Sequence, residues 1–329
     1  MGGFNLRIRT PQCSAEAMFS ANLEMPYTLR ETAWGVQSSH MAFPNIRRIL
    51  RVGSLFNSYK LILAVGTSSR PRYRALFLAL LRPFIRNGEI PIRCRCYERY
   101  NKTFLRVSDL SSDCLSTLEL CVRDIYRLDR NFRPGVVIDG GGNIGLFTLR
   151  VAASISAASH TSTRFVICEP LPRNVGQIQK HLRINDVQAE VLPVCLGGTC
   201  RSIPFYCRAA HESSFDADVP YDSVMEIPVI RLQDAIGDSP AERVLIKLDI
   251  EGMEVEALQT YVPTEQRAVY IVGELHNRAQ NAPLMEQLFR EYGWELEFFD
   301  VDQKACNFRA CSPLAVPLLG WASSRAGAR

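Results

Sequence analysis

The sequence predicts an α/β fold with a mostly parallel, doubly wound sheet. Short runs rich in Val and Ile alternate with helical stretches, as in a series of β-α-β units. One run, VVI at residues 136–138, is followed by an acid, three glycines and an apolar helical face. With 329 residues, 47% of them hydrophobic, the chain can bury one α/β domain and carry an extension of roughly a hundred residues.

The segment from residue 136 to residue 145 reads as a strand, a tight turn and the start of a helix. Its β-branched residues suit a strand buried on both faces of a parallel sheet. Glycines allow positive φ angles and a close approach of the backbone to a ligand, and Asn143 is expected to cap the helix. Ligands of open α/β sheets bind at this carboxyl edge. The predicted cofactor-binding residues of the turn are Asp139, Gly140, Gly141, Gly142, Asn143 and Gly145.

Glycine spacing alone does not choose the cofactor, because the turn also satisfies the dinucleotide pattern GxGxxG. Asp139 directly precedes the turn, where a carboxylate would repel the pyrophosphate of a dinucleotide. The sulfonium and ammonium of S-adenosylmethionine (SAM) tolerate that acid. Glu169 ends the next strand and can take both ribose hydroxyls of either cofactor. SAM is therefore favoured, and NAD remains the alternative.

The other elements follow from the same alternation. Further strands are expected at residues 164–169, 189–194, 202–207, 226–231, 243–249, 268–274 and 294–300. Helices are expected at residues 77–85, 115–126, 172–184, 253–260 and 283–292. The connection between residues 207 and 226 is long and polar, and loops of that length are usually functional or disordered. We expect it to overhang the cofactor site as part of a substrate lid.

Two neighbouring strand ends carry the candidate catalytic residues. Asp249 and Glu251 end one strand, and Glu274 and His276 end the next, where alternation puts the last two on one side. His276 is the preferred general base, with Glu274 and Asp249 beside it. Glu251 is expected to contact the cofactor, as is Asp249, although helix N-terminal acids are also common at such positions.

Six segments in this order resemble the FkbM-type SAM-dependent methyltransferases. They are VIDGGGNIGLFT, VICEPLPRNVGQIQKHLRIN, HESSF, IPVIRLQDAI, VLIKLDIEGMEVEAL and VYIVGELH, between about residues 136 and 276. The resemblance implies a Rossmann-like class I methyltransferase fold and the cofactor SAM. It also implies that His211, Ser213 and Ser214 contact cofactor or acceptor. Ala commonly occupies the family position of Gly141 or Gly142, so the triple glycine is expected to loosen the loop.

The resemblance further implies an enzyme that methylates a hydroxyl of a sugar, glycan or natural-product acceptor. A non-catalytic adaptor on the same fold is a second alternative. The predicted domains are a basic helical or irregular extension at residues 1–104, the methyltransferase domain at 105–310 and a partly disordered tail at 311–329.

Composition restricts the partners. Residues 1–130 hold 20 Lys and Arg against 10 Asp and Glu, although the net charge of the chain is only +4. The arginines of this region are interpreted first as a solvated helix face. The alternative is contact with an anionic partner, a membrane surface or an anionic substrate, the last reached through Arg93 and Arg95, and no nucleic acid is expected.

No apolar run is long enough to span a membrane, and no secretory signal is recognisable. The 11 cysteines are scattered and lack a CxxC pair, which favours reduced thiols and a cytoplasmic protein. No metal is assigned, although Asp249, Glu251 and Glu274 offer oxygen ligands for Mg²⁺, and Cys94 with Cys96 or Cys195 with Cys200 could bind a metal.

Overall fold

The structure is a computed structural model. It describes residues 88–96, 99–106, 108–155, 163–199, 201–207, 221, 223–302 and 304–319. All of these belong to one compact unit, residues 49–329. The helix expected at residues 77–85 and the middle of the expected lid, residues 208–220, lie outside the described residues.

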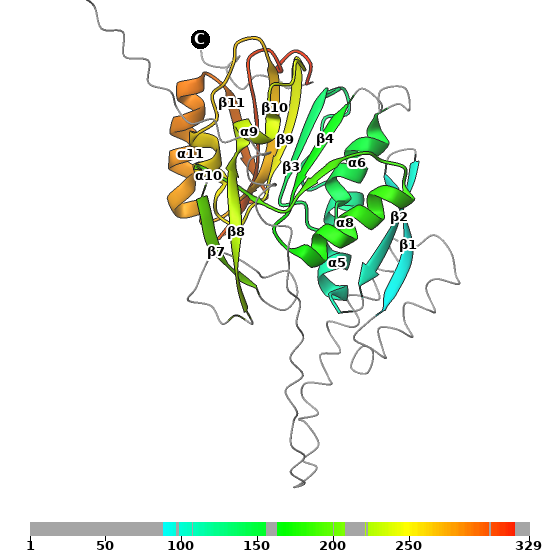
Figure 1. The fold of residues 1–329 in the computed structure, drawn as a ribbon. Helices are drawn as coiled ribbons and strands as arrows, with labels where there is room; N and C mark the ends of the chain where they lie inside the picture. The colour runs from blue at the N-terminus through cyan, green and yellow to red at the C-terminus, as the bar shows by residue number, and fades with distance from the viewer. Residues whose placement is uncertain are drawn as a thin grey trace, which may run out of the picture. The chain divides into compact units, whose positions relative to one another are not determined.

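A seven-stranded sheet forms the centre of the described part (Figure 1). Its order is β11-β12-β10-β9-β3-β4-β5. The strands are β3 (Val136–Gly140), β4 (Arg164–Cys168), β5 (Glu190–Leu192), β9 (Arg243–Leu248), β10 (Ala268–Leu275), β11 (Glu295–Phe299) and β12 (Cys306–Cys311). Five of these strands, β5, β4, β3, β9 and β10, are parallel to one another, so their carboxyl ends share one edge.

The last strand in sequence reverses the sheet. Strand β12 is inserted between β10 and β11 and is antiparallel to both. A dinucleotide-binding Rossmann sheet instead continues with parallel strands in sequence order. The sequence analysis missed β12, since its last expected strand ends at residue 300. The residues of β12, CNFRAC, follow β11 after a short polar connection.

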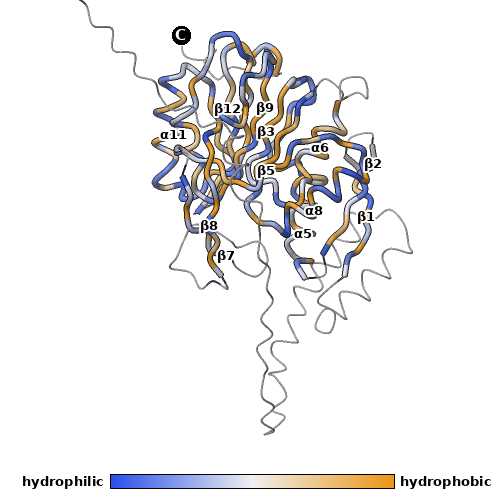
Figure 2. The backbone as a smooth tube through the Cα atoms, viewed as in Figure 1, coloured by the Kyte–Doolittle hydropathy of each residue, from blue (hydrophilic) through white to orange (hydrophobic). Residues whose placement is uncertain are grey.

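Helices cover both faces of this sheet (Figure 1). One side carries α6 (Leu146–Ser154) and α8 (Pro172–Ile184), and the other carries α9 (Leu232–Ile236), α10 (Glu254–Gln259) and α11 (Arg278–Tyr292). Figure 2 shows hydrophobic central strands and hydrophilic positions on the outer helices. None of the helices in the described ranges is both long and apolar enough to cross a membrane.

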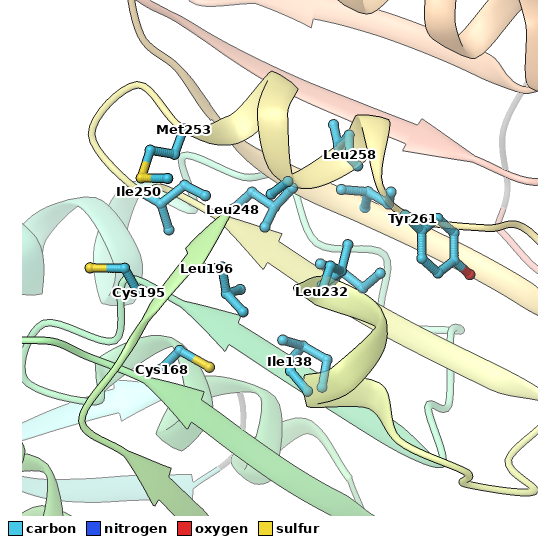
Figure 3. Packing of buried hydrophobic residues seen from close by; sticks show 14 of the residues in the cluster. Ile138, Cys168, Cys195, Leu196, Leu232, Leu248, Ile250, Met253, Leu258 and Tyr261 are labelled. Atoms are coloured by element: carbon cyan, nitrogen blue, oxygen red, sulfur yellow. The ribbon is translucent and has the colours of Figure 1, made fainter. Parts of the chain in front are cut away.

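Alternation along β3 supplies both hydrophobic cores. Val136 and Ile138 pack in the larger core with helices α9 to α11, whereas Val137 packs in the second core with α6. All three side chains are 0% exposed, as expected for a strand buried on both faces. The larger core reaches Cys168 and Cys195 near the carboxyl edge of the sheet (Figure 3).

A smaller sheet lies beside the central one. It contains β6 (Cys195–Gly197), β8 (Ser223–Arg231) and β7 (Arg201–Cys207), in the order β6-β8-β7. The strand expected at residues 189–194 is in fact β5, and the chain then changes sheets to form β6. Val194 N–H bonds the carbonyl of Leu192 at this change of direction.

A hairpin precedes the first parallel strand. Strands β1 (Glu89–Cys96) and β2 (Arg99–Arg106) pair antiparallel and are followed by α5 (Leu110–Thr117) and the π-helix η1 (Leu118–Arg123). Asn185, at the end of α8, exchanges two hydrogen bonds with the backbone of Lys102. The predicted boundary at residue 104 therefore falls inside a hairpin that is bonded to the central domain.

The other predicted boundary also falls inside packed structure. Cys311 is the last residue of β12 and pairs with Tyr270. Beyond it, Ala315 and Leu319 are buried in the second core. The predicted tail thus begins with ordered residues, because apolar side chains continue past β12, and residues 320–329 lie outside the described ranges.

Candidate functional site

The glycine-rich turn is close-packed. The N–H groups of Gly141 and Gly142 both donate to the carbonyl of Cys168, at 3.0 and 3.1 Å. A Cβ at Gly141, where φ is +72°, would lie 1.9 Å from the carbonyl oxygen of Asp249, and one at Gly142 would lie 2.3 Å from Cγ2 of Ile167. Neither position has room for alanine, so the expectation that the triple glycine loosens the loop is wrong for this chain.

The cap of helix α6 differs from the prediction. The N-cap residue is Gly145, with φ of 82°, and no side chain caps the helix. Asn143 instead donates its backbone N–H to Glu169 at 2.7 Å and its side-chain amide to Ser116 at 3.0 Å. Its left-handed φ of 48° turns it toward these partners and away from the helix end.

Asp139 is an internal residue. Its side chain is 0% exposed and accepts hydrogen bonds from the N–H and hydroxyl of Thr148. Burial raises its pKa, and the nearby Lys247 ammonium opposes this shift. Asp139 lines neither of the cavities described below, so it does not face a bound pyrophosphate, and the repulsion argument against a dinucleotide does not apply.

Lys247 is the buried partner of Asp139. Its Nζ lies 3.6 Å from Asp139, 3.5 Å from Asp249 and 2.5 Å from the carbonyl oxygen of Gly141. The two acids raise the pKa of Lys247 despite its burial. Sequence analysis missed Lys247, although a lysine in the apolar strand VLIKL, two residues before Asp249, shares a strand face with that acid.

Glu169 follows β4 and is held by three donors. Its carboxylate accepts hydrogen bonds from the backbone of Asn143 and Leu171 and from the side chain of Asn174. Burial nevertheless raises its pKa to about 7. Arg106 donates to the amide oxygen of Asn174 at 2.7 Å, so the hairpin supports this residue from behind.

The first cavity has a volume of about 670 Å³ and opens to solvent. It lies at the carboxyl edge of the sheet, between the glycine turn and the small sheet. Its polar lining comes from Asn143, Glu169, Asn174, Asp249 and Glu251. Its apolar lining includes Leu171, Val194, Leu196, Phe205 and Ile250.

The second cavity has a volume of about 410 Å³ and shares Gly141, Asn143 and Asp249 with the first. Its floor is the glycine turn and the first residues of helix α6. Its walls come from η1 and from the ends of β9 and β10. The polar side chains lining it are Ser116, Glu119, Tyr126, Asn143, Lys247, Asp249 and Glu274.

Glu119 was missed by the sequence analysis. It is half-buried on the π-helix η1, a form of helix that is frequent at functional sites. Burial, with the charges of Glu274 and Asp249, raises its pKa to about 7. Only the sheet topology brings this residue to the two strand ends, so no local sequence signal could have revealed it.

His276 lies among acids. Its Nδ1 is 3.0 Å from Glu254, and its Nε2 is 3.8 Å from Glu251. Although burial opposes protonation, the hydrogen bond to Glu254 and the surrounding acids raise the pKa of His276 to about 10. A protonated imidazole cannot act as a general base, so the geometry does not favour the base role predicted for His276.

Glu251 and Glu254 have different roles. Glu254 is 0% exposed and accepts the N–H groups of Ile250 and Gly252, as the helix N-terminal interpretation expects. Glu251 lines the first cavity, has a left-handed φ of 58°, and its side chain is 40% exposed. A non-glycine residue in that conformation is strained, which is common at functional sites.

The three predicted catalytic residues lie together. Asp249, Glu274 and His276 each offer one ligand atom, and these atoms are within 4.8 Å of one another. Tyr126 donates its hydroxyl to Asp249 at 2.9 Å, whereas the carboxylate of Glu274 has no hydrogen-bond partner among the described residues. The spacing of these atoms fits one cation. Protonated His276 already places a positive charge beside the two carboxylates, and we assign no metal.

Several predicted site residues lie away from the cavities. Gly140 and Gly145 shape the turn without lining either cavity. Arg93 is exposed on β1 and lines neither cavity, so its predicted contact with an anionic acceptor has no support in this geometry. The loop residues His211, Ser213 and Ser214, and the side chain of Arg95, lie outside the described residues.

The sheet with its reversed strand β12, and the site at the carboxyl edge, define the class I SAM-methyltransferase fold. Comparison with known families finds a similar domain. Residues 139–296 match the family model described as "Methyltransferase FkbM domain". This part of the chain is therefore similar to an FkbM methyltransferase domain, in agreement with the resemblance seen in the sequence.

Known proteins share this similarity. "Methyltransferase 1" of Beauveria bassiana (strain ARSEF 2860) is 27% identical over 146 residues, which cover 37% of this chain and 57% of that protein. Among solved structures, the precorrin-6y C5,15-methyltransferase of Geobacter metallireducens is 12% identical with a TM-score of 0.34, covering 57% of this chain and 84% of its own. The T. Thermophilus 16S rRNA N2 G1207 methyltransferase, in complex with AdoMet and guanosine, is 15% identical with a TM-score of 0.35, covering 68% and 50%.

Proposed function

We propose that this protein is a SAM-dependent methyltransferase that methylates a hydroxyl group of a neutral acceptor, such as a sugar, a glycan or a natural product. The observation that carries the proposal is the pair of cavities at the carboxyl edge. Gly141, Asn143 and Asp249 contribute to the lining of both, beside the glycine-rich turn. The family match at residues 139–296 supports the reaction class.

The first cavity suits the adenosine half of SAM. Glu169 lies at its polar end, where its carboxylate can accept ribose hydroxyls, and the donors from Asn143 and Asn174 hold it in place. Apolar side chains such as Leu196 and Phe205 line the remaining wall, as a flat base requires.

The second cavity suits the methionine half of SAM. Leu146 and Phe147 line it and are the first residues of helix α6, so their N–H groups lack intrahelical acceptors and favour a carboxylate. The acids Glu119, Asp249 and Glu274 line the same cavity and favour positive charge. Both ends of an amino-acid zwitterion thus have a matching wall, whereas the second nucleotide of NAD would meet three carboxylates.

SAM bound in this way supplies an electrophilic methyl group. The chain's contribution is to hold the acceptor oxygen in line with it, which is the main catalytic effect in such a displacement. Glu274 is the general base that we favour over His276, because its carboxylate faces the cavity and burial with the charge of Asp249 raises its pKa. Protonated His276 and Tyr126 then orient the acids: His276 contacts Glu251, and Tyr126 donates to Asp249.

The charge of the site favours a neutral acceptor. Asp249, Glu251 and Glu274 gather at the two strand ends, and Lys247 is already engaged by Asp139 and Asp249. A phosphate or a nucleic-acid backbone entering there would be repelled. The hydroxyls of a polyol can donate hydrogen bonds to the same carboxylates. Cytoplasmic action remains a prediction, supported by free thiols such as Cys94, Cys168 and Cys195.

Calorimetry on the purified protein tests the cofactor. Micromolar binding of SAM and of its demethylated product, S-adenosylhomocysteine (SAH), with none of NAD, is the expected result. Glu169→Gln should weaken SAM binding at least about tenfold, since an amide cannot accept from all three donors. Glu190→Gln, at an exposed acid on β5, is the matched control.

Either of two results would contradict the proposal: tight NAD binding, or no binding of SAM or SAH by folded protein. If SAM does bind, release of SAH from SAM in the presence of pooled sugars or pooled phenols would identify the acceptor class. A preference for phosphorylated acceptors would contradict the neutral-acceptor part alone.

A further inference from the structure

We propose that Glu119, with Asp249 and Glu274, forms an acidic wall that makes the site discriminate charged SAM from neutral SAH. The inference rests on the proposed function and assigns a role to a residue outside the family-matched segment. All three acids line the second cavity, and Asp249 lines the first cavity as well.

The geometry leaves the wall open to a ligand. Tyr126 donates to Oδ2 of Asp249, and the ammonium of Lys247 lies 3.5 Å from the same oxygen. Within the described ranges, no hydrogen bond or ion pair engages the carboxylate of Glu119 or of Glu274. Two acids with free oxygens therefore line the cavity that we propose for the methionine half of SAM.

The charges around Glu119 can be named element by element. Asp249 and Glu274 face it from the ends of β9 and β10, and Arg123 lies on its own helix. Protonated His276 follows β10 close to both acids, but it is paired with Glu254 and lies near Glu251. Helix α6, packed against η1, carries Arg150, which is engaged by Asp124 and by the carbonyl of Leu120. On β9, Lys247 lines the same cavity but is shared by Asp139 and Asp249. The wall therefore keeps a net negative charge when Glu119 is ionised.

SAM and SAH isolate the effect of the wall. They share adenosine, amine and carboxylate, and differ in the methyl group and the charge on sulfur. An ionised carboxylate lining this cavity attracts both the sulfonium and the ammonium of SAM but only the ammonium of SAH, so it stabilises SAM more than SAH. Because SAM binding favours ionised Glu119, the ratio Kd(SAH)/Kd(SAM) should rise with pH through the range in which Glu119 titrates.

The test measures both dissociation constants by calorimetry at pH 6 and pH 8. In the wild type, the ratio should rise roughly tenfold between these values, the effect of one nearby charge at high effective dielectric. Glu119→Gln should lower SAM affinity at pH 8 by at least a similar factor and lower SAH affinity less, because SAH offers only its ammonium to this carboxylate; it should also flatten the pH dependence of the ratio. Glu265→Gln, an exposed acid at the opposite edge of the sheet, should change neither value.

Three outcomes separate the claims. A pH-independent ratio in the wild type would overturn the acidic wall while leaving SAM binding intact. Equal weakening of SAM and SAH by Glu119→Gln, with an unchanged melting temperature, would also overturn it. Failure of wild-type protein to bind either ligand would reject the proposed function itself. If Glu119→Gln does not fold, Glu119→Asp tests the same ratio, which should stay pH-dependent.

Discussion

At the scale of single residues, Lys247 organises the site. Its ammonium is nearly fully buried, yet it joins Asp139 below the turn, the carbonyl of Gly141 in the turn and Asp249 at the cavity. Asp139 lines neither cavity and reaches the turn only through its contact with Lys247. A buried pair of this kind holds a geometry whose loss is costly, because either partner alone is an uncompensated charge.

Removing one partner of this pair should cost more than removing both. We expect Lys247→Met to lower the free energy of unfolding by about 3 kcal/mol, because Asp139 is left charged or must take up a proton. Adding Asp139→Asn to Lys247→Met should recover at least about 1 kcal/mol. Urea denaturation of the two single variants and the double variant measures this coupling. Additive effects would mean that the two residues do not stabilise each other.

At the scale of elements, the glycine turn and the hairpin fix the shape of the cavities. Gly141 lets the turn pass against the end of β9, and strand β2 is bonded to α8 behind the turn. The buried His181 accepts the N–H of Phe104 at its Nε2, and its Nδ1 lies 2.8 Å from the carbonyl of Ile144. The chain before the first parallel strand thus holds the turn in place.

Alanine substitutions should distinguish close contact from backbone strain. Gly141→Ala meets backbone at 1.9 Å and also has a positive φ, so we expect a loss of about 3 kcal/mol or more. Gly145→Ala has space, with its nearest neighbour 3.5 Å away, and should cost only about 1 kcal/mol for its φ. Equal losses in a denaturation experiment would show that close packing at Gly141 is unimportant.

Local patterns predicted the parallel strands and helix α8. Short β-branched runs between helical stretches, and a proline in the first turn of a helix, are signals that a few neighbouring residues carry. The sequence also predicted that Glu274, His276 and Asp249 lie at one edge of the sheet, and the structure places them together there. Strand β12, the hairpin β1–β2 and Glu119 were missed, since their roles depend on partners far along the chain. The protonation expected of His276 was likewise invisible, because Glu254 reaches it from another element.

At the scale of the whole molecule, the charge distribution opposes stability in the free protein. Glu119 and Glu169 each have a pKa raised to about 7, mainly by burial. These acids surround the two cavities, so the region that we propose for SAM is also where negative charge is poorly solvated. A cationic ligand would offset this cost, which couples binding to stability.

This distribution predicts that the free protein is more stable at pH 6 than at pH 8. A carboxyl whose pKa is raised on folding loses stabilising protonation as pH rises from its unfolded pKa of 4.5 through about 7. His276 acts in the same direction, since its pKa of about 10 gives stability that is complete below 6.5 and is lost as pH rises through 10. His181, buried with a lowered pKa, opposes folding below its unfolded value of 6.5 and limits the gain in acid.

Thermal denaturation at pH 6 and pH 8, with and without saturating SAM, measures this balance. We expect a higher melting temperature at pH 6 in the free protein and a larger SAM-induced rise at pH 8, where Glu119 is ionised and attracts the sulfonium. SAH keeps the ammonium but lacks the sulfonium charge, so the melting-temperature rise that it causes should differ less between the two pH values than the rise caused by SAM. A free protein that is more stable at pH 8 would show that the cavity acids are hydrated and already ionised at little cost, and the acidic wall would then lose its energetic basis.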